Sequence, residues 1–248
     1  MNRPRLLRAE LRKLWTTKMP LGFLAVLVVI CVITAIAVIY GKDADGTKSF
    51  IATREDQRSL LAFAANTFVI AGLFGAIGVA REYGHNTVIP MYLVTPRRRR
   101  AMLFQLTAIV IAGAILGLVG EVLTLAAGAI SMPVAGQAVL FTIGDVVRLS
   151  AAAALAGAAG ALLGAGVGAI VRNTGGAVTG AVLLLIIVPP IAVQLTSHAA
   201  SWVPSTLANI VSGVGGGTSL AAAALALVVW GLIPALAALV VVQRRDVV

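Results

Sequence analysis

The sequence predicts an all-α polytopic membrane protein with six transmembrane helices, and two observations support this fold class. Hydrophobic residues make up 60% of the 248 residues, only 11% are charged, and the mean hydropathy is +1.02. A soluble domain of this length would need much more polar surface. Long uncharged windows also recur along the chain, and at about 1.5 Å per residue about 20 residues cross a hydrocarbon core of about 30 Å.

We expect a single transmembrane domain over residues 1–248. Its spans are expected at about 19–40, 59–80, 101–127, 145–171, 174–193 and 219–242. The first window is longer than the apolar region of a secretory signal peptide, which is about 7–15 residues, so we expect a retained span. An even number of spans puts both termini on the same side of the membrane.

The distribution of Lys and Arg predicts which side that is. Of the 19 Lys and Arg residues, five fall on the side opposite the termini: Lys42, Lys48, Arg54, Arg58 and Arg148. Positive residues concentrate on the cytoplasmic side of membrane proteins, so we expect cytoplasmic termini. The loop 81–100 is then cytoplasmic, and its Arg97, Arg98, Arg99 and Arg100 hold the inner end of the third span at the headgroups, since arginine is costly at the bilayer centre.

Three segments outside or within the spans carry further patterns. Residues 1–18 have apolar and basic residues on different helical faces, which predicts an amphipathic interfacial helix. Residues 194–218 are apolar for an outer loop, which predicts a short helix lying in or dipping into the outer leaflet. In the fourth span, Gly157, Gly160, Gly164 and Gly168 predict a close helix-packing face, within the subunit or between subunits.

Several function classes lack their signatures. The net charge of +10 is better explained by topology and anionic lipid than by nucleic acid, because no recognition module accompanies it. "GKDADGTKS" fails as a phosphate-binding loop, since Thr47 stands where lysine is required. No metal-binding or hydrolase motif is present, and the single Cys31 allows no intrachain disulfide.

Charged residues near the ends of spans form a candidate outer polar cluster. Glu121 is expected near the outer end of the third span, and Asp145 and Arg148 could pair with each other or with Glu121. Such a cluster could hold helices together, or Glu121 could act as a gate or substrate contact.

One segment carries a recognisable pattern: Gly72, Gly75, Gly78, Arg81, Glu82, Tyr83, Thr87, Thr95, Pro96, Arg97 and Arg98. It resembles the inner loop of ABC type-2 exporter permeases, the membrane subunits of ATP-binding-cassette exporters. "LLRAELRKLWTTK" is similar to the N-terminal interfacial helix of that family, and "SWVPSTLAN" is similar to its last outer loop. Four consecutive arginines depart from the one or two that are usual there.

The resemblance implies a cytoplasmic coupling helix within 81–100 that docks on a separate ATPase subunit. The docking residues would be Arg81, Glu82, Tyr83, His85, Asn86 and Thr87. The family implies two ATPase subunits, which bind ATP and Mg, and a second permease chain, identical or homologous. This chain would hold no cofactor of its own and would not be an enzyme.

The substrate path would then lie at the permease dimer interface, lined by the second and fifth spans. Its candidate residues are Asn66, Thr67, Phe68 and Thr179, and their apolar surroundings favour a hydrophobic cargo such as a drug, lipid or peptide. The expected location is a bacterial plasma membrane. Two alternatives remain: a proton-coupled secondary transporter that uses Glu121, and a non-transporting membrane sensor or anchor subunit.

Overall fold

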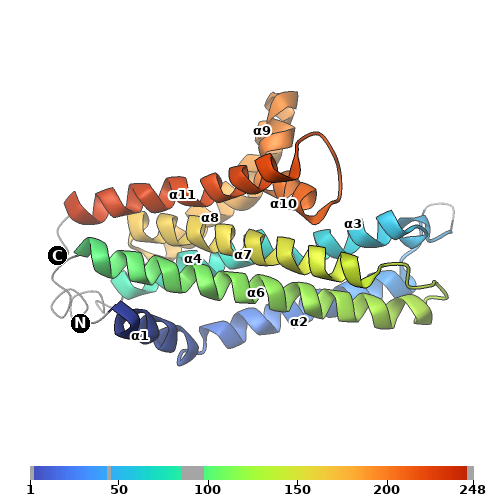
Figure 1. Cartoon of the computed structure of the whole chain (residues 1–248), viewed down its shortest axis with the longest axis horizontal. Helices are drawn as coiled ribbons and strands as arrows, with labels where there is room; N and C mark the ends of the chain where they lie inside the picture. Colours follow the sequence, from blue (N-terminus) through green and yellow to red (C-terminus); the bar gives the residue numbers. More distant parts are fainter. Residues whose placement is uncertain (1–2, 44–45, 85–97, 245–248) are drawn as a thin grey trace.

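A computed structural model of the chain describes residues 3–43, 46–84 and 98–244, and within these ranges the fold is all-helical (Figure 1). The longer helices run side by side in an elongated bundle, while α9 projects away from it (Figure 1). The elements are α1 (Arg3–Trp15), α2 (Met19–Tyr40), a 3₁₀ turn (Ser49–Ile51), α3 (Arg54–Ala65), α4 (Thr67–Gly84), α6 (Arg98–Val134), α7 (Ile143–Val171), α8 (Thr174–Val182), a π-helical turn (Leu183–Ile187), α9 (Val188–Leu195), a second 3₁₀ turn (Ser197–Trp202), α10 (Pro204–Ser212) and α11 (Leu220–Arg244).

The described part of the chain contains six helical segments long and apolar enough to cross a membrane. They are Met19–Tyr40, Arg54–Gly84, Arg98–Val134, Ile143–Val171, Thr174–Leu195 and Leu220–Arg244. This confirms the all-helical fold class and gives six helices able to span a membrane, as predicted, which indicates a multi-pass membrane protein. The helix predicted within residues 1–18 is present as α1.

The second span is not the continuous helix expected over 59–80. It consists of α3 and α4, separated at Asn66, whose φ of +34° lies in the left-handed region that few non-glycine residues adopt. Backbone hydrogen bonding resumes from the Asn66 carbonyl, which accepts from the N–H groups of Val69 and Ile70. The other expected spans differ from the structure mainly in length, and α6 extends furthest beyond its expected range of 101–127.

Glycines in α7 account for its close packing against α4 and α6. A methyl group at Gly160 would overlap the Phe68 carbonyl, and one at Gly164 would overlap the Gly72 carbonyl. On the other side, a methyl group at Gly157 would overlap the Gly113 carbonyl of α6. The glycine pattern of the fourth span is therefore a packing face within the subunit, one of the two alternatives that the sequence left open.

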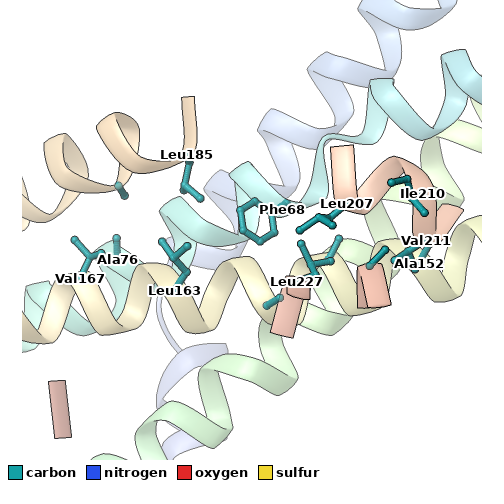
Figure 2. Packing of buried hydrophobic residues seen from close by; sticks show 14 of the residues in the cluster. Phe68, Ala76, Ala152, Leu163, Val167, Leu185, Leu207, Ile210, Val211 and Leu227 are labelled. Carbon is teal, nitrogen blue, oxygen red and sulfur yellow. The ribbon is translucent and has the colours of Figure 1, made fainter. Parts of the chain in front are cut away.

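The main apolar core lies where α4, α7, α10 and α11 meet (Figure 2). Phe68 of α4, Leu207 of α10 and Leu227 of α11 lie together there, and each is almost completely buried. The segment 194–218, predicted to contain a short helix, contributes α10, which packs on the bundle.

Charged residues gather at the two ends of the bundle. The arginine-rich end is where α1, the last turn of α4 (Gly84), the start of α6 (Arg98) and the end of α11 (Arg244) gather (Figure 1). The opposite end, where α6 is followed by α7, is named the Asp145 end.

Candidate functional site

The last turn of α4 is joined to α1 by ionic contacts at the arginine-rich end. Lys13 Nζ lies 2.7 Å from Glu82 Oε1 and 2.6 Å from Glu10 Oε2. Glu10 and Lys13 lie one helical turn apart on α1, so both face the same patch of α4. Glu82 is only 5% exposed, which makes this a largely desolvated contact.

The charge state of Lys13 follows from its two acidic neighbours. Partial burial opposes ionisation of the ammonium, but the Glu82 and Glu10 carboxylates outweigh that effect and raise the pKa of Lys13 above its ordinary value. Lys13 therefore stays charged throughout the physiological range. Its ammonium neutralises part of the negative charge that Glu82 brings into the protein.

The two residues that follow Glu82 contact two further elements. The Tyr83 ring lies beneath the guanidinium of Arg172, whose Cζ is 5.3 Å from the ring centroid. Arg172 ends α7 in the left-handed conformation, with φ +58°, and its N–H donates to the Gly168 carbonyl. Gly84 lies against Thr174, the first residue of α8. The final three residues of α4 are thus held by α1, α7 and α8 in turn.

The predicted docking residues are only partly described. Arg81, Glu82 and Tyr83 lie in the last turn of α4, whereas His85, Asn86, Thr87 and Arg97 lie outside the described residues. Arg98, Arg99 and Arg100 form the first turn of α6, where Arg99 is exposed and Arg100 lies 5.9 Å from the centroid of the Phe104 ring. The arginines and the last turn of α4 therefore flank the segment 85–97 on both sides.

A second ionic cluster lies at the Asp145 end. Asp145 Oδ2 accepts a hydrogen bond from Arg54 Nε at 2.9 Å, and Asp145 Oδ1 lies 3.2 Å from Arg58 Nε. Asp145 also caps the start of α7 together with Thr142. Arg58 donates to the Gly213 carbonyl at 3.0 Å, which links α3 to the end of α10.

This cluster differs in membership from the predicted one. Asp145 pairs with Arg54 and Arg58 of α3 rather than with Arg148, whose guanidinium packs against Gly213 instead. Glu121 is not part of it. Glu121 lies 13 residues before the end of α6, about 20 Å along the helix.

Glu121 is buried inside the bundle, with 1% exposure. Its Oε1 has no hydrogen-bond partner among the described residues. Gly113, Gly117 and Glu121 are spaced four residues apart, so they share one side of α6. Both glycines on this side pack against α7. The neighbouring Gly120 lies beside Thr67, the first residue of α4, so Glu121 belongs to the region where the second span is broken.

The predicted path residues do not share one environment. Asn66 is exposed at the break between α3 and α4, whereas Thr67 is buried and its Oγ1 donates to the Ala153 carbonyl of α7 at 3.3 Å. Phe68 is buried in the core shown in Figure 2. Thr179 is exposed on α8, and its hydroxyl donates to the Gly175 carbonyl of its own helix.

Sequence reasoning did not identify Glu10, Lys13 or Arg172 as partners of the last turn of α4. A signal existed only for the first two, because an acidic and a basic residue three positions apart share one face of the predicted helix. In the described ranges, no group of three or more His, Cys, Asp and Glu residues could hold a metal ion.

Comparison of the sequence with models of known protein families gave no match. A search of curated proteins found none with significant similarity.

Proposed function

We propose that the chain is the membrane-spanning permease subunit of an ATP-driven exporter in a bacterial plasma membrane, with cytoplasmic termini. In this proposal α1 is the interfacial helix and residues 81–100 hold the coupling helix. A separate ATPase that binds ATP and Mg docks on this segment, and the complete exporter contains two copies of that ATPase. A second permease chain, identical or homologous, completes a path for a hydrophobic cargo such as a drug, lipid or peptide.

One observation carries the proposal: the last turn of α4 is anchored to three other elements directly before the segment 85–97. Glu82 contacts Lys13 of α1, Tyr83 lies beneath Arg172 of α7, and Gly84 lies against α8. A displacement applied to 85–97 would therefore reach several helices at once. An anchorage of this kind suits a subunit that a motor protein moves from one side of the membrane.

The same contacts refine the roles of the proposed docking residues. The Glu82 carboxylate is buried and engaged by Lys13, so in this proposal it supports the docking segment instead of touching the ATPase. The half-buried Arg81 and Tyr83 and the exposed Arg99 present more surface to a partner. Direct docking then falls mainly to His85, Asn86 and Thr87.

The test is affinity purification of the chain from its native membrane in mild detergent, with identification of the proteins that accompany it. We expect an ATPase of the cassette type, recovered in equal amount with the permease. The triple variant His85→Ala, Asn86→Ala, Thr87→Ala should lose the ATPase. The matched control Lys42→Ala, in the loop after α2, should retain it. Absence of such an ATPase in several detergents would overturn the proposal.

A second candidate function rests on Glu121. A carboxyl group with 1% exposure and an unpartnered oxygen, within a segment long enough to span the membrane, suits a proton-binding site of a secondary transporter. Reconstitution separates the two candidates. Uptake or release that follows an imposed proton gradient without ATP, and that stops in Glu121→Gln, would favour the secondary transporter.

A further inference from the structure

A groove at the junction of α1 and α2 is lined almost wholly by apolar side chains. Trp15, Leu21 and Phe74 contribute to its walls, with Ala112 and Leu116 of α6. Its volume is about 290 Å³. This is just below the range of about 300–1,000 Å³ found for pockets that hold small molecules, so it suits part of a long ligand better than a whole one.

The exposed face of α1 beside this groove is basic. Arg8, Arg12 and Trp15 are spaced i, i+4 and i+7, and all three are exposed, which places them on one stripe of the helix. Trp15 belongs to both features, because it lines the groove and is 59% exposed at the end of the basic stripe. Leu14 also lines the groove, and it is buried in an apolar cluster with Met102 and Leu106 of α6.

A further cation stands at the edge of the groove. Thr17 lines it, and the next residue, Lys18, is exposed immediately before α2 begins. Glu10 and Glu82 are both within 2.7 Å of Lys13, so the acidic groups near α1 already have their cation. Arg8, Arg12 and Lys18 form no ion pair with a described residue, and their side chains are exposed.

We infer that this groove is a binding site for an anionic phospholipid. The acyl chain lies against Leu21, Phe74 and Ala112, and the phosphate group lies at Arg12 and Lys18. Trp15 has an amphipathic ring suited to the boundary between the two parts of the ligand. The inference goes beyond the proposed transport function and is independent of it, because it rests on the groove and its charges alone.

Trp15 supplies the probe for a direct test. In a variant with Trp202→Phe and Trp230→Phe, Trp15 is the only tryptophan, and bromine atoms on lipid acyl chains quench its fluorescence on contact. The protein is reconstituted in phosphatidylcholine vesicles that contain increasing fractions of brominated phosphatidylglycerol or brominated phosphatidylcholine. We expect brominated phosphatidylglycerol to reach half-maximal quenching at a mole fraction about fivefold lower than brominated phosphatidylcholine does. This ratio corresponds to about 1 kcal/mol, which is the contribution of one basic residue near a membrane surface.

Two variants and their controls make the test specific. Arg12→Gln with Lys18→Gln should abolish the preference for phosphatidylglycerol, whereas Lys42→Gln at the other end of α2 should preserve it. Ala112→Phe should fill the groove and reduce quenching by the anionic lipid, whereas Ala221→Phe on the exposed face of α11 should not. Equal quenching by both lipids at every mole fraction would overturn the site, and so would a preference that survives the loss of Arg12 and Lys18.

A second measurement uses the unmodified chain. Native mass spectrometry of protein released from mixed vesicles should show retained phosphatidylglycerol in excess of its share of the vesicle. Retention in proportion to vesicle composition would identify ordinary surrounding lipid and would refute the inference.

Discussion

Lys13 Nζ lies 2.7 Å from Glu82 Oε1, so the first helix of the chain is joined to the last turn of α4 by a contact that is mostly buried. Glu10 completes the group from the adjacent turn of α1. The position of α1 on the bundle therefore depends on charge as well as on the apolar contacts of Leu7, Leu11 and Leu14.

The first prediction concerns the strength of this ion pair. Lys13→Met should lower the stability of the folded protein by about 1–3 kcal/mol, because Glu82 would remain buried without its cation while the partial exposure of Lys13 limits the loss. Glu82→Lys should be more severe, since it brings two ammonium groups together. The measurement is the midpoint of thermal unfolding in detergent, with Lys13→Arg as the charge-conserving control. The double variant Lys13→Met, Glu82→Gln should show a coupling of about 0.5–3 kcal/mol, and strictly additive effects would contradict the pairing.

A second prediction follows from the raised pKa of Lys13. That pKa is higher in the folded than in the unfolded protein. The contact therefore contributes its full stabilisation of the fold at pH values below the ordinary lysine pKa, and this contribution is lost as the pH rises through the raised pKa. We expect the midpoint of thermal unfolding in detergent to fall as the pH is raised above about 10.5. The Glu82→Gln variant should show a weaker dependence in the same range. Identical pH profiles for the two proteins would refute this explanation.

The third prediction concerns the close contact between α4 and α7. Gly164→Ala should destabilise the protein and reduce its yield, because the added methyl group meets the Gly72 carbonyl, which is fixed in a helix. Gly22→Ala in α2 is the matched control, since no atom lies within 4 Å of the position of the new methyl group. That control should be neutral or stabilising by up to about 1 kcal/mol. Equal effects of the two substitutions on the unfolding midpoint would argue against the packing described.

A fourth prediction concerns the Asp145 end. Asp145→Ala should lower stability by about 1–3 kcal/mol, because it removes the acceptor of Arg54 and the charge partner of Arg58 and also weakens the start of α7. Glu55→Gln is the control on the exposed first turn of α3 and should change the unfolding midpoint little. Arg148→Gln should leave the Asp145 contacts in place. A larger effect for Arg148→Gln than for Asp145→Ala would contradict the assigned pairs.

The fifth prediction tests whether the role of Glu121 is structural or mechanistic. Under the exporter proposal, Glu121→Gln should preserve assembly and leave ATP hydrolysis by the purified complex measurable. Complete loss of that activity in an intact complex would instead give Glu121 a mechanistic role. Glu121→Leu should be neutral or stabilising for folding, because it removes a buried polar group with an unpartnered oxygen.

The sequence predicted most of the spans because their limits depend on local properties. The first span begins and ends at the predicted residues, Met19 and Tyr40, since charged residues lie just outside the apolar run and Pro20 favours a helix start. The glycine spacing of the fourth span likewise predicted a packing face, because residues four apart share one side of a helix. The structure then showed which helices fill that face.

The break at Asn66 and the ionic pairs could not be predicted in the same way. Asn66 and Thr67 are polar residues within the apolar window, and Asn adopts a positive φ more readily than most residues, but such a pair without Pro or Gly does not by itself mark the end of a helix. Asp145 has a basic residue one turn away at Arg148, yet its partners come from α3, far away in the sequence. Choices among distant partners depend on how the helices assemble, and a pattern within one segment does not contain that information.

The glycine contact between α4 and α7 also has a practical consequence for measuring motion. Because backbone meets backbone there, no layer of flexible side chains can absorb a shift, and the spacing of these two helices should be the same in every state of the protein. Spectroscopic labels attached to α4 and α7, in a background with Cys31 replaced, would give an internal ruler of constant length. Displacements of α1, α9 or α11 could then be expressed relative to that ruler, independently of how the whole molecule tilts in the bilayer.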